Sequence, residues 1–447
     1  MVQSAHPAIT GRFTFQRRVA SRLGKRLTTT PGRLRLASVA IVSGLLAVAV
    51  VGSGAVQARH RATNAVGQQA EPLLVGAQTI YFSLADADAT ATNTFLQSGL
   101  EPPARRQVYL DDLTAATDQL AKLAGKAGTS RDATDALSVI TKNLPTYSGF
   151  VEAARANNRQ GFPVGAAYLR EGSALMQTKI LPAAGQLYQV EAGRLNRAYD
   201  SGQSSLDIAG VLLVALVVLG LLVAIQLFVA QRTNRLLNAP LLVASGLTLV
   251  LLAWTVFAFS ASGSRLSEAR RRGSGPVQLL SSARILVSRA EVDENLALVA
   301  RGSGSQYLAD FDAVTSTLGP ADGSSGLLHE AGLSVLPGAG SALVGPGHSY
   351  AHYLSAHSAV VKAENTGHFD QAVQLATGAG PNDELPAEAA LGANLGDGIR
   401  QAQAAFDARA AAAARDLSGL SLGVIALVVV TAVSATVGLQ QRINEYR

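Results

Sequence analysis

Four long apolar runs constrain this chain more than any other feature of its sequence. A helix of about 20 residues crosses the hydrocarbon core of a bilayer, where the backbone has to satisfy its own hydrogen bonds. Apart from Asp207 at the edge of the second run, no run contains a charged side chain between its flanks. Four such runs argue against the buried helices of a soluble protein. We therefore predict four transmembrane helices at residues 36–57, 206–230, 241–262 and 417–438.

Basic residues in the short flanking segments set the expected orientation. The tail at residues 1–35 has eight Lys and Arg and no acid, and the 231–240 turn and the 439–447 tail have two Arg each. Short loops rich in Lys and Arg stay in the cytoplasm, whereas long segments cross largely regardless of charge. Four arginines after the third run argue the other way, but they belong to a long segment. We expect a multi-pass plasma membrane protein with both termini in the cytoplasm and residues 58–205 and 263–416 outside.

The first run has a second interpretation, as a signal peptide. Val56-Gln57-Ala58 resembles a cleavage site with small residues, and cleavage there would leave Arg59 as the N-terminus. The apolar run of about 20 residues is longer than the core of a usual signal peptide. The basic region before it is also long, so a retained anchor is favoured.

The two outside segments have nearly equal lengths, which prompts a search for an internal repeat. An offset of 206 residues superposes the second run on the fourth and aligns several identical residues. The aligned pairs are Leu36 and Leu242, Tyr147 and Tyr353, Gly161 and Gly367, Ala166 and Ala372, Leu169 and Leu375, and Arg194 and Arg400. We interpret the chain as a tandem duplication of a unit with two spans and one outer helical domain.

The first outer segment has the periodicity of a helical bundle. Apolar residues recur at steps of three and four over residues 66–91, 109–127, 133–154 and 166–190, as in the seams of packed helices. This pattern predicts an up-down four-helix bundle whose first and last helices approach the membrane spans. Aromatic residues and strand-like alternation are sparse. The fold class is therefore an all-α membrane protein with helical bundles outside.

Turn residues separate these four seams. Pro102 and Pro103 are expected to end the first helix, and Thr129 or Ser130 is expected to cap the third. An Asn- and Gly-containing stretch, 157–161, ends the third helix, and Pro182 is expected to kink the fourth.

The second outer segment keeps two clear seams, at residues 279–300 and 350–364. Between them, residues 319–347 are rich in Gly, Pro and Ser, a composition that breaks regular helices. We expect this insert to be irregular, either as a surface loop or as an ordered excursion that contacts something.

Motifs for catalysis are missing from the sequence. It contains no phosphate-binding loop, no nucleophile elbow, no kinase motif and no His-Glu-x-x-His helix. The absence of cysteine excludes disulfides and thiolate metal sites. The three cytoplasmic pieces are too small for a kinase or cyclase domain. We expect a protein that is not an enzyme, needs no cofactor and binds no nucleic acid.

Two groups of polar residues are candidate sites. His348 and His352 are four residues apart, so on a helix they share a face and form a weak candidate for a metal pair, although no carboxylate sits beside them at ligand spacing. The second group consists of carboxylates near the seams, which either bind a ligand or fix the register of helices as ion pairs. These carboxylates are Asp86, Asp88, Glu291 and Asp293. Arg284 or Arg289 is the expected partner of Asp293, because a buried carboxylate needs one.

Two further features concern the membrane region. The basic tail supplies candidate contacts to anionic lipid or to an acidic cytosolic partner, although it also suffices as a topology signal alone. The residues concerned are Arg12, Arg17, Arg18, Arg22, Lys25 and Arg26. Gly419 and Gly423 have the spacing that permits close packing of transmembrane helices.

This combination of features resembles the GlnX family of actinobacterial four-span membrane proteins, which is linked to amino-acid sensing. The resemblance rests on the Arg-rich tail, the four spans and the two outer helical domains. Residues 157–171 and 180–184 are the parts most typical of that family. The outer bundles also resemble the ligand-binding domains of chemoreceptors, but this chain lacks their cytoplasmic signalling region.

The resemblance implies a signal relay. An extracytoplasmic amino-acid-binding lipoprotein, GlnH in that family, would engage the outer domains, and the signal would reach the cytosolic serine/threonine kinase PknG. The alternative is a structural or accessory membrane protein, such as a scaffold for a transporter or the cell envelope, without a ligand. Either a monomer with paired bundles or a homodimer is compatible with the sequence.

Overall fold

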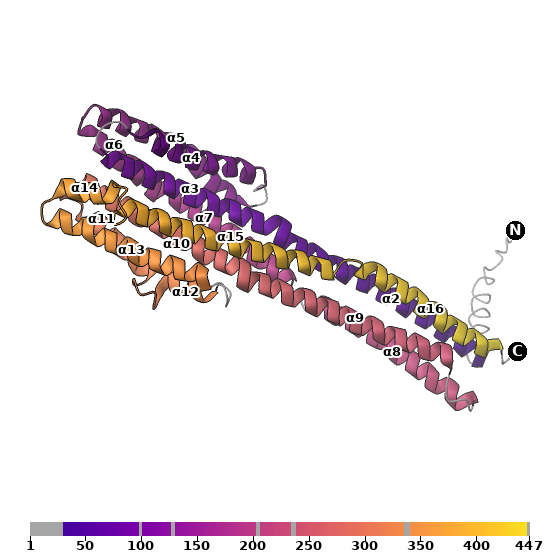
Figure 1. Cartoon of the computed structure of the whole chain (residues 1–447). Helices are drawn as coiled ribbons and strands as arrows, with labels where there is room; N and C mark the ends of the chain where they lie inside the picture. Colours follow the sequence, from indigo (N-terminus) through magenta and orange to yellow (C-terminus); the bar gives the residue numbers. More distant parts are fainter. Residues whose placement is uncertain are drawn as a thin grey trace, which may run out of the picture. The chain divides into compact units, whose positions relative to one another are not determined.

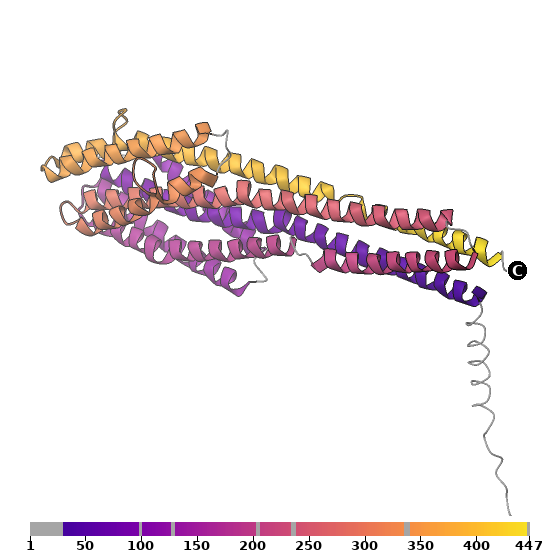
Figure 2. The ribbon, with the colours of Figure 1, turned by 90° about the horizontal axis from the view of Figure 1, so that it is seen from below.

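The structure is a computed structural model that describes residues 30–97, 101–126, 130–202, 206–233, 238–334 and 340–444. Within these ranges every regular element is a helix and no strand occurs (Figures 1 and 2). The predicted fold class, an all-α membrane protein, is confirmed. Contacts divide the chain into two compact units. The membrane unit comprises residues up to Arg61, Gln203–Gly263 and residues from Ala414, and the large unit comprises Ala62–Gly202 and Ser264–Ala413.

Within the described ranges, four helical stretches are long and apolar enough to cross a membrane. They include α2 (Thr30–Asn64), α8 (Leu206–Thr233), α9 (Ala239–Ala269) and α16 (Leu420–Asn444), and α16 begins inside the predicted span 417–438. Side chains such as Ile41, Leu222 and Phe259 form a common core among them. Large apolar side chains also cover their outer faces, and Phe257 and Leu422 are 73% and 75% exposed. An apolar exterior around an apolar core suits a multi-pass membrane protein.

Only one glycine of the Gly419 and Gly423 pair packs closely, because nothing lies within 4 Å of a Cβ atom added to Gly419. A Cβ atom on Gly423 would lie 2.2 Å from the indole ring of Trp254 on α9. On the opposite side of the same unit, the Asn238 amide donates a hydrogen bond of 3.0 Å to the Gly438 carbonyl. The turn between α8 and α9 is thereby tied to α16.

The first half of the large unit is a bundle built on the predicted seams. It consists of helices α3 (Glu71–Leu96), α4 (Pro103–Ala124), α5 (Arg131–Arg159), α6 (Val164–Leu175) and α7 (Leu181–Gly202), with π-helical turns η1 (Ala65–Ala70) and η2 (Met176–Ile180). All seven predicted seam positions of α5, from Ala133 to Ala154, are buried. The Ser130 hydroxyl accepts from the Ala133 amide and so caps α5, as predicted.

Pro103 acts differently from expectation. α3 already ends at Leu96, and Pro103 instead begins α4, because proline at the first helical position loses no intrahelical hydrogen bond. Pro182 directly follows the π-helical turn η2, whose wider backbone tolerates a residue without an N–H donor. The kink expected at Pro182 stays a prediction.

The second half contains η3 (Arg270–Ser274), α10 (Gly275–Val299), α11 (Ser305–Leu318), α12 (Gly326–Ser334), α13 (Gly340–Asn365), α14 (Phe369–Thr377) and α15 (Glu384–Asp416). The expectation that residues 319–347 form no regular helix was wrong. α12 and the first turns of α13 lie within this stretch. Gly319 and Gly326, with φ of 111° and 86°, delimit the irregular part. Between Gly326 and Gly332 the α12 sequence is Leu-Leu-His-Glu-Ala, and Ala331 packs into the core.

The two halves share contacts along their length within the large unit. α3 packs against α10, where Ala89, Val292 and Leu296 form a small apolar cluster. A further core within the large unit combines residues from η1, α3, α7, α9 and α15. This shared core contains Val66, Leu74, Leu195, Tyr199, Leu266, Ala269, Phe406 and Ala410.

Several local structures recur at the predicted offset. Gly161 and Gly367 both have left-handed backbone, with φ of 71° and 79°. The amides of Gly161 and Gly367 each donate a 2.9 Å hydrogen bond to the carbonyl three residues earlier. The ion pair of Arg194 with Glu191 corresponds to that of Arg400 with Asp397. These correspondences support the duplication, which stays a prediction because no comparison tests it.

We predict that Gly273→Ala destabilises the large unit. A Cβ atom at this position would lie 2.6 Å from Cβ and 2.7 Å from Cα of Phe406, so the backbone of α15 would have to move. Overpacking of this kind costs about 1–3 kcal/mol. Gly193→Ala is the matched control, because nothing lies within 4 Å of its added Cβ. Thermal unfolding of the purified chain measures both, and equal midpoints would contradict the shared core.

Candidate functional site

A cleft of about 760 Å³ lies between the two halves of the large unit, at the end where α3 and α10 terminate. We call it the distal cleft. The first half contributes the end of α3 and the turn from α5 to α6, and the second half contributes the end of α10 and α14 (Figure 1). Its lining consists of Phe95, Leu96, Asn158, Arg159, Gly161, Phe162, Pro163, Ala166, Leu298, Val299, Ala300, Arg301, Phe369 and Val373.

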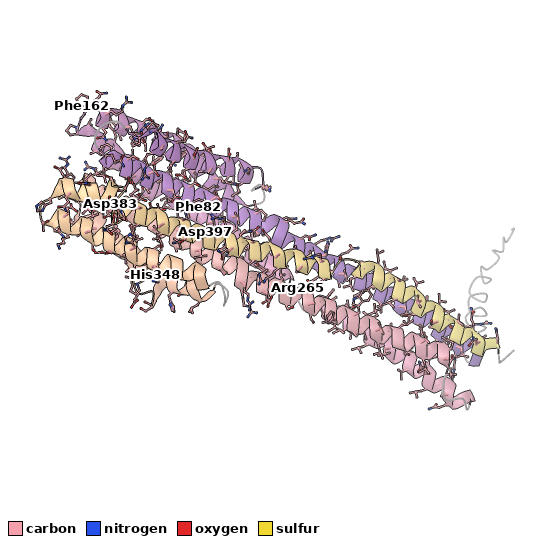
Figure 3. The ribbon with its side chains drawn as sticks, in the orientation of Figure 1. Phe82, Phe162, Arg265, His348, Asp383 and Asp397 are labelled. Atoms are coloured by element: carbon pink, nitrogen blue, oxygen red, sulfur yellow. The ribbon has the colours of Figure 1, made fainter. Side chains whose placement is uncertain are left out.

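The end of α5 shapes one wall of the distal cleft. Because Gly161 adopts a left-handed φ of 71°, the chain reverses there, and the Phe162 amide donates back to the Asn157 carbonyl. This turn leaves the Phe162 side chain 52% exposed at the tip of the unit (Figure 3). The Asn158 amide also donates to the Phe95 carbonyl at 3.0 Å, which fixes the end of α5 against α3.

The opposite wall carries backbone strain. Arg301, with φ of 44°, is the one non-glycine residue with positive φ among those that the structure describes. Its guanidinium lies 4.9 Å from the ring centroid of Phe369, in cation–π contact. Such outliers occur preferentially at functional sites. Together with Arg159, Arg301 gives the cleft two guanidinium groups, which favour an anionic group such as a carboxylate.

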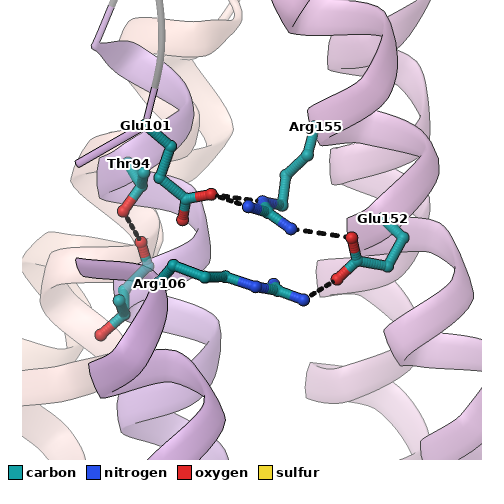
Figure 4. Close-up of polar contacts among 6 residues, drawn as sticks. Thr94, Glu101, Arg106, Glu152 and Arg155 are labelled. Carbon is teal, nitrogen blue, oxygen red and sulfur yellow. Dashed lines mark hydrogen bonds and ion pairs between the residues drawn. The ribbon is translucent and has the colours of Figure 1, made fainter. Parts of the chain in front are cut away.

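A network of charged residues lies beside the distal cleft, on the first half (Figure 4). Arg155 pairs with Glu101 and, at 2.7 Å, with Glu152, while Arg106 pairs with the same Glu152. Arg106 also lies 4.9 Å from the Tyr109 ring centroid. Three of these charged residues, Glu101, Arg106 and Arg155, border a smaller pocket that shares Phe95, Asn158 and Arg159 with the cleft. The network therefore joins the start of α4 to the cleft wall on α5.

The predicted carboxylates lie elsewhere, in the interior and between the halves. Asp86 on α3 accepts from Arg284 of α10 at 2.8 Å and from the Ser288 hydroxyl. Asp88 points into the first bundle, where it accepts from Ser173 at 2.7 Å and Tyr147 at 3.2 Å. Burial raises the pKa of Asp88 to about 6 despite these two donors. Asp86 thus sets register between the halves, whereas Asp88 joins α3, α5 and α6.

The other two carboxylates are also buried, and neither lines the distal cleft. Burial raises the pKa of Asp293 to about 7, against the nearby charge of Arg289. Arg284, one of the two partners expected for Asp293, pairs with Asp86 instead. Burial, and then the charge of Glu388, raises the pKa of Glu291 well above its usual value. The sequence could not show that Arg284 faces the other half, because the pairing of α3 with α10 decides it.

The predicted metal pair, His348 and His352, is not the place where possible metal ligands come together. His348 (labelled in Figure 3) and His352 are both exposed on α13. Nε2 of His352 lies 3.1 Å from the Pro381 carbonyl. Among the described residues, possible ligand atoms converge instead at Glu294, His357 and Glu384. His357 occupies a seam position of α13, which was the available signal for a histidine that points inward.

The remaining candidates were the six basic tail residues Arg12, Arg17, Arg18, Arg22, Lys25 and Arg26, which lie outside the described residues. One wall of the distal cleft could be anticipated, because it is formed by residues of the stretch 157–171 that the resemblance to the GlnX family singled out. No sequence pattern indicated the other wall, which contains Arg301 and Phe369.

Residues 62–200 match the family model of the Actinobacterial sensor domain. The match spans the first half of the large unit, from η1 to α7, and includes the walls of the distal cleft that Phe95 and Phe162 provide. It assigns this chain a sensor role. No curated protein and no solved structure matches the chain.

We predict that Asp88→Asn stabilises the chain at neutral pH. A carboxyl group with a raised pKa in the folded chain is most stabilising when protonated, so stability falls as pH rises from 3.8 to about 6 and then levels off. Asparagine keeps an acceptor for Ser173 and Tyr147 without the buried charge. The expected gain at pH 7.5 is at most about 3 kcal/mol, since one pKa unit corresponds to about 1.4 kcal/mol.

Denaturation of the detergent-solubilised chain at pH 7.5 and pH 4 measures this difference, which should shrink at the lower pH. Asp118→Asn, at an exposed position of α4, is the control and should change little at either pH. A loss of stability in Asp88→Asn at pH 7.5 would show that the carboxylate is needed in its charged form.

Proposed function

We propose that this chain is an extracytoplasmic sensor whose distal cleft receives an amino-acid signal and relays it to a cytosolic partner. The observation that carries the proposal is the position of the cleft. Both halves build it, so a ligand that binds there acts on the packing of one half against the other. The sensor-domain match over residues 62–200 supports the same assignment.

The chemistry of the cleft favours a ligand with a carboxylate. Arg159 and Arg301 supply guanidinium groups, and Phe95, Phe162 and Phe369 supply aromatic surface. A volume of about 760 Å³ is larger than an amino acid needs and lies within the range of small-molecule sites. The exposed Phe162 at the rim is typical of protein interfaces. An amino-acid-binding lipoprotein that docks at this rim satisfies both features.

Three long helices offer a route for the proposed signal between the large unit and the membrane unit. α2, α9 and α15 each contribute residues to the membrane unit and to the large unit. A shift of one helix along its axis is carried by its backbone hydrogen bonds over its whole length. The π-helical turns η1 and η3 follow α2 and α9 in the chain, and such turns permit local changes of register. Small helix shifts of this type are a known means of switching.

In this proposal another protein receives the signal. The segments of this sequence predicted to lie in the cytoplasm are residues 1–35, 231–240 and 439–447. The proposed recipient is a serine/threonine kinase, by resemblance to the GlnX family. The basic tail would contact an acidic surface of that kinase or anionic lipid.

We predict that Arg159→Gln and Phe162→Ala each weaken binding of the amino-acid-loaded lipoprotein by about tenfold, the effect of losing a moderate hot-spot residue. The full chain in lipid nanodiscs is titrated with the purified lipoprotein, alone and with glutamate, aspartate, glutamine or glycine. Leu333→Ala is the matched control, because Leu333 is 76% exposed on α12 and does not line the cleft.

Three results would count against the proposal. Equal losses in Leu333→Ala would show that the distal cleft is not the docking site. Affinity purification from membranes that recovers permease or ATPase subunits, without a kinase, would favour the alternative of an accessory scaffold. Unchanged glutamate homeostasis after deletion of the chain would argue against the amino-acid version.

A further inference from the structure

Three side chains from three helices converge at a buried point in the second half. They are Glu294 of α10, His357 of α13 and Glu384, the first residue of α15. Nδ1 of His357 lies 2.9 Å from Oε1 of Glu294 and 3.9 Å from Oε1 of Glu384. The side chains of Glu294 and Glu384 are only 3% and 6% exposed, and that of His357 is 13% exposed.

The three converging atoms lack hydrogen-bond partners. Oε1 of Glu294, Oε1 of Glu384 and Nδ1 of His357 are all buried, and none makes a hydrogen bond with acceptable geometry in the described part of the chain. Buried polar atoms are nearly always hydrogen-bonded, and the 2.9 Å ion-pair contact of His357 with Glu294 leaves the second buried carboxylate, Glu384, with no equally close positive charge. Two carboxylate oxygens and an imidazole nitrogen that face one another therefore point to a positively charged partner.

We propose that Glu294, His357 and Glu384 bind a first-row divalent cation of the zinc type. Bonds of 2.0–2.2 Å to nitrogen and oxygen imply distances of about 3.4 Å between ligand atoms in a tetrahedron. The observed 2.9 Å and 3.9 Å lie on either side of that value, so small side-chain shifts complete the site. Imidazole favours Zn²⁺ over Ca²⁺ and Mg²⁺, which prefer oxygen ligands alone.

The surroundings of His357 suit a ligand. The Phe311 ring stacks on the imidazole at 3.7 Å between centroids and 16° between planes, and this contact fixes the orientation of the imidazole. A surface groove of about 440 Å³ beside it gives access from solvent. The groove is lined by His357, Ser358, Val361, Lys362, Asn365 and Thr366. A bound cation would join α10, α13 and α15, because each helix contributes one ligand.

Among the described residues, the group of Glu294, His357 and Glu384 has no counterpart in the first half. At the offset of 206 residues, Glu294 corresponds to Asp88 and His357 corresponds to Val151. In the first half Asp88 accepts from both Ser173 and Tyr147, so its carboxylate is satisfied by hydroxyl groups alone. The second half has instead a second carboxylate and an imidazole, and its ligand atoms are left without partners.

The test uses the full chain in lipid nanodiscs, purified with a tag that contains no histidine and stripped with a chelator. Titration with ZnCl₂ in a calorimeter should show one tight site per chain, and elemental analysis after dialysis should find one zinc ion. Zn²⁺ should also raise the thermal midpoint. Glu384→Gln and His357→Gln should each weaken Zn²⁺ binding by more than about tenfold, since even outer-sphere partners contribute 10–100-fold.

Asp88→Asn and His352→Gln are the matched controls, and both should retain the site. Circular dichroism monitors folding, and if a variant does not fold, X-ray absorption of the wild-type zinc complex decides by detecting one imidazole among oxygen ligands. The proposal fails if no stoichiometric zinc binds, which would leave the two carboxyl groups sharing a proton. It also fails if His352→Gln removes the site while His357→Gln retains it.

Discussion

The packing of α3 against α10 is the contact on which the rest of the large unit depends. It combines the ion pair of Asp86 with Arg284, an apolar cluster around Val292 and a hydrogen bond of 3.4 Å from Asn295 to Thr92. The ion pair is partly exposed and therefore contributes modestly to stability. Its stronger effect is on register, because a slip of α10 by one turn would leave buried polar groups on both helices unpaired. The distal cleft exists only where this register brings the two helix ends together.

The interior of the large unit contains many carboxylates for a helical protein. Burial raises the pKa of Glu71, Asp112 and Glu388 to about 7 each, as it does for Asp293. The fold therefore holds groups that are close to half protonated near neutral pH, and its stability is linked to protons and other cations. Arg284 moderates the pKa of Asp112 and Glu388, because it lies between the halves. A sensor built in this way contains several weakly balanced contacts, which a small change at the cleft can shift.

The spacing of apolar residues predicted the helices well, because that spacing depends only on which face of each helix is buried. Each seam position of α5 is buried, and the bundle and the spans follow from the same pattern. Local chemistry also predicted the Ser130 cap. The sequence could not show which helices distant in the chain pack against each other. This packing places Arg284 beside Asp86 and Glu384 near His357. The composition of residues 319–347 misled for a related reason, since tertiary packing of Ala331 stabilises a helix between two glycines.

The two halves agree in their backbone turns and in part of their core, but they differ in the partners of their buried carboxylates. Gly161 and Gly367 keep the same left-handed turn because a helix reversal of this shape needs glycine at that position. Tyr147 and Tyr353 are both fully buried at equivalent positions, so the core has conserved its geometry at one level of each half. The carboxylates beside them differ in their partners: hydroxyl groups surround Asp88, whereas a second carboxylate and an imidazole face Glu294. Aromatic and guanidinium groups from both halves line the distal cleft, whereas within the described ranges the converging carboxylates and imidazole belong to the second half. Under the two proposals above, the halves would respond to different chemical signals through the shared contact of α3 with α10.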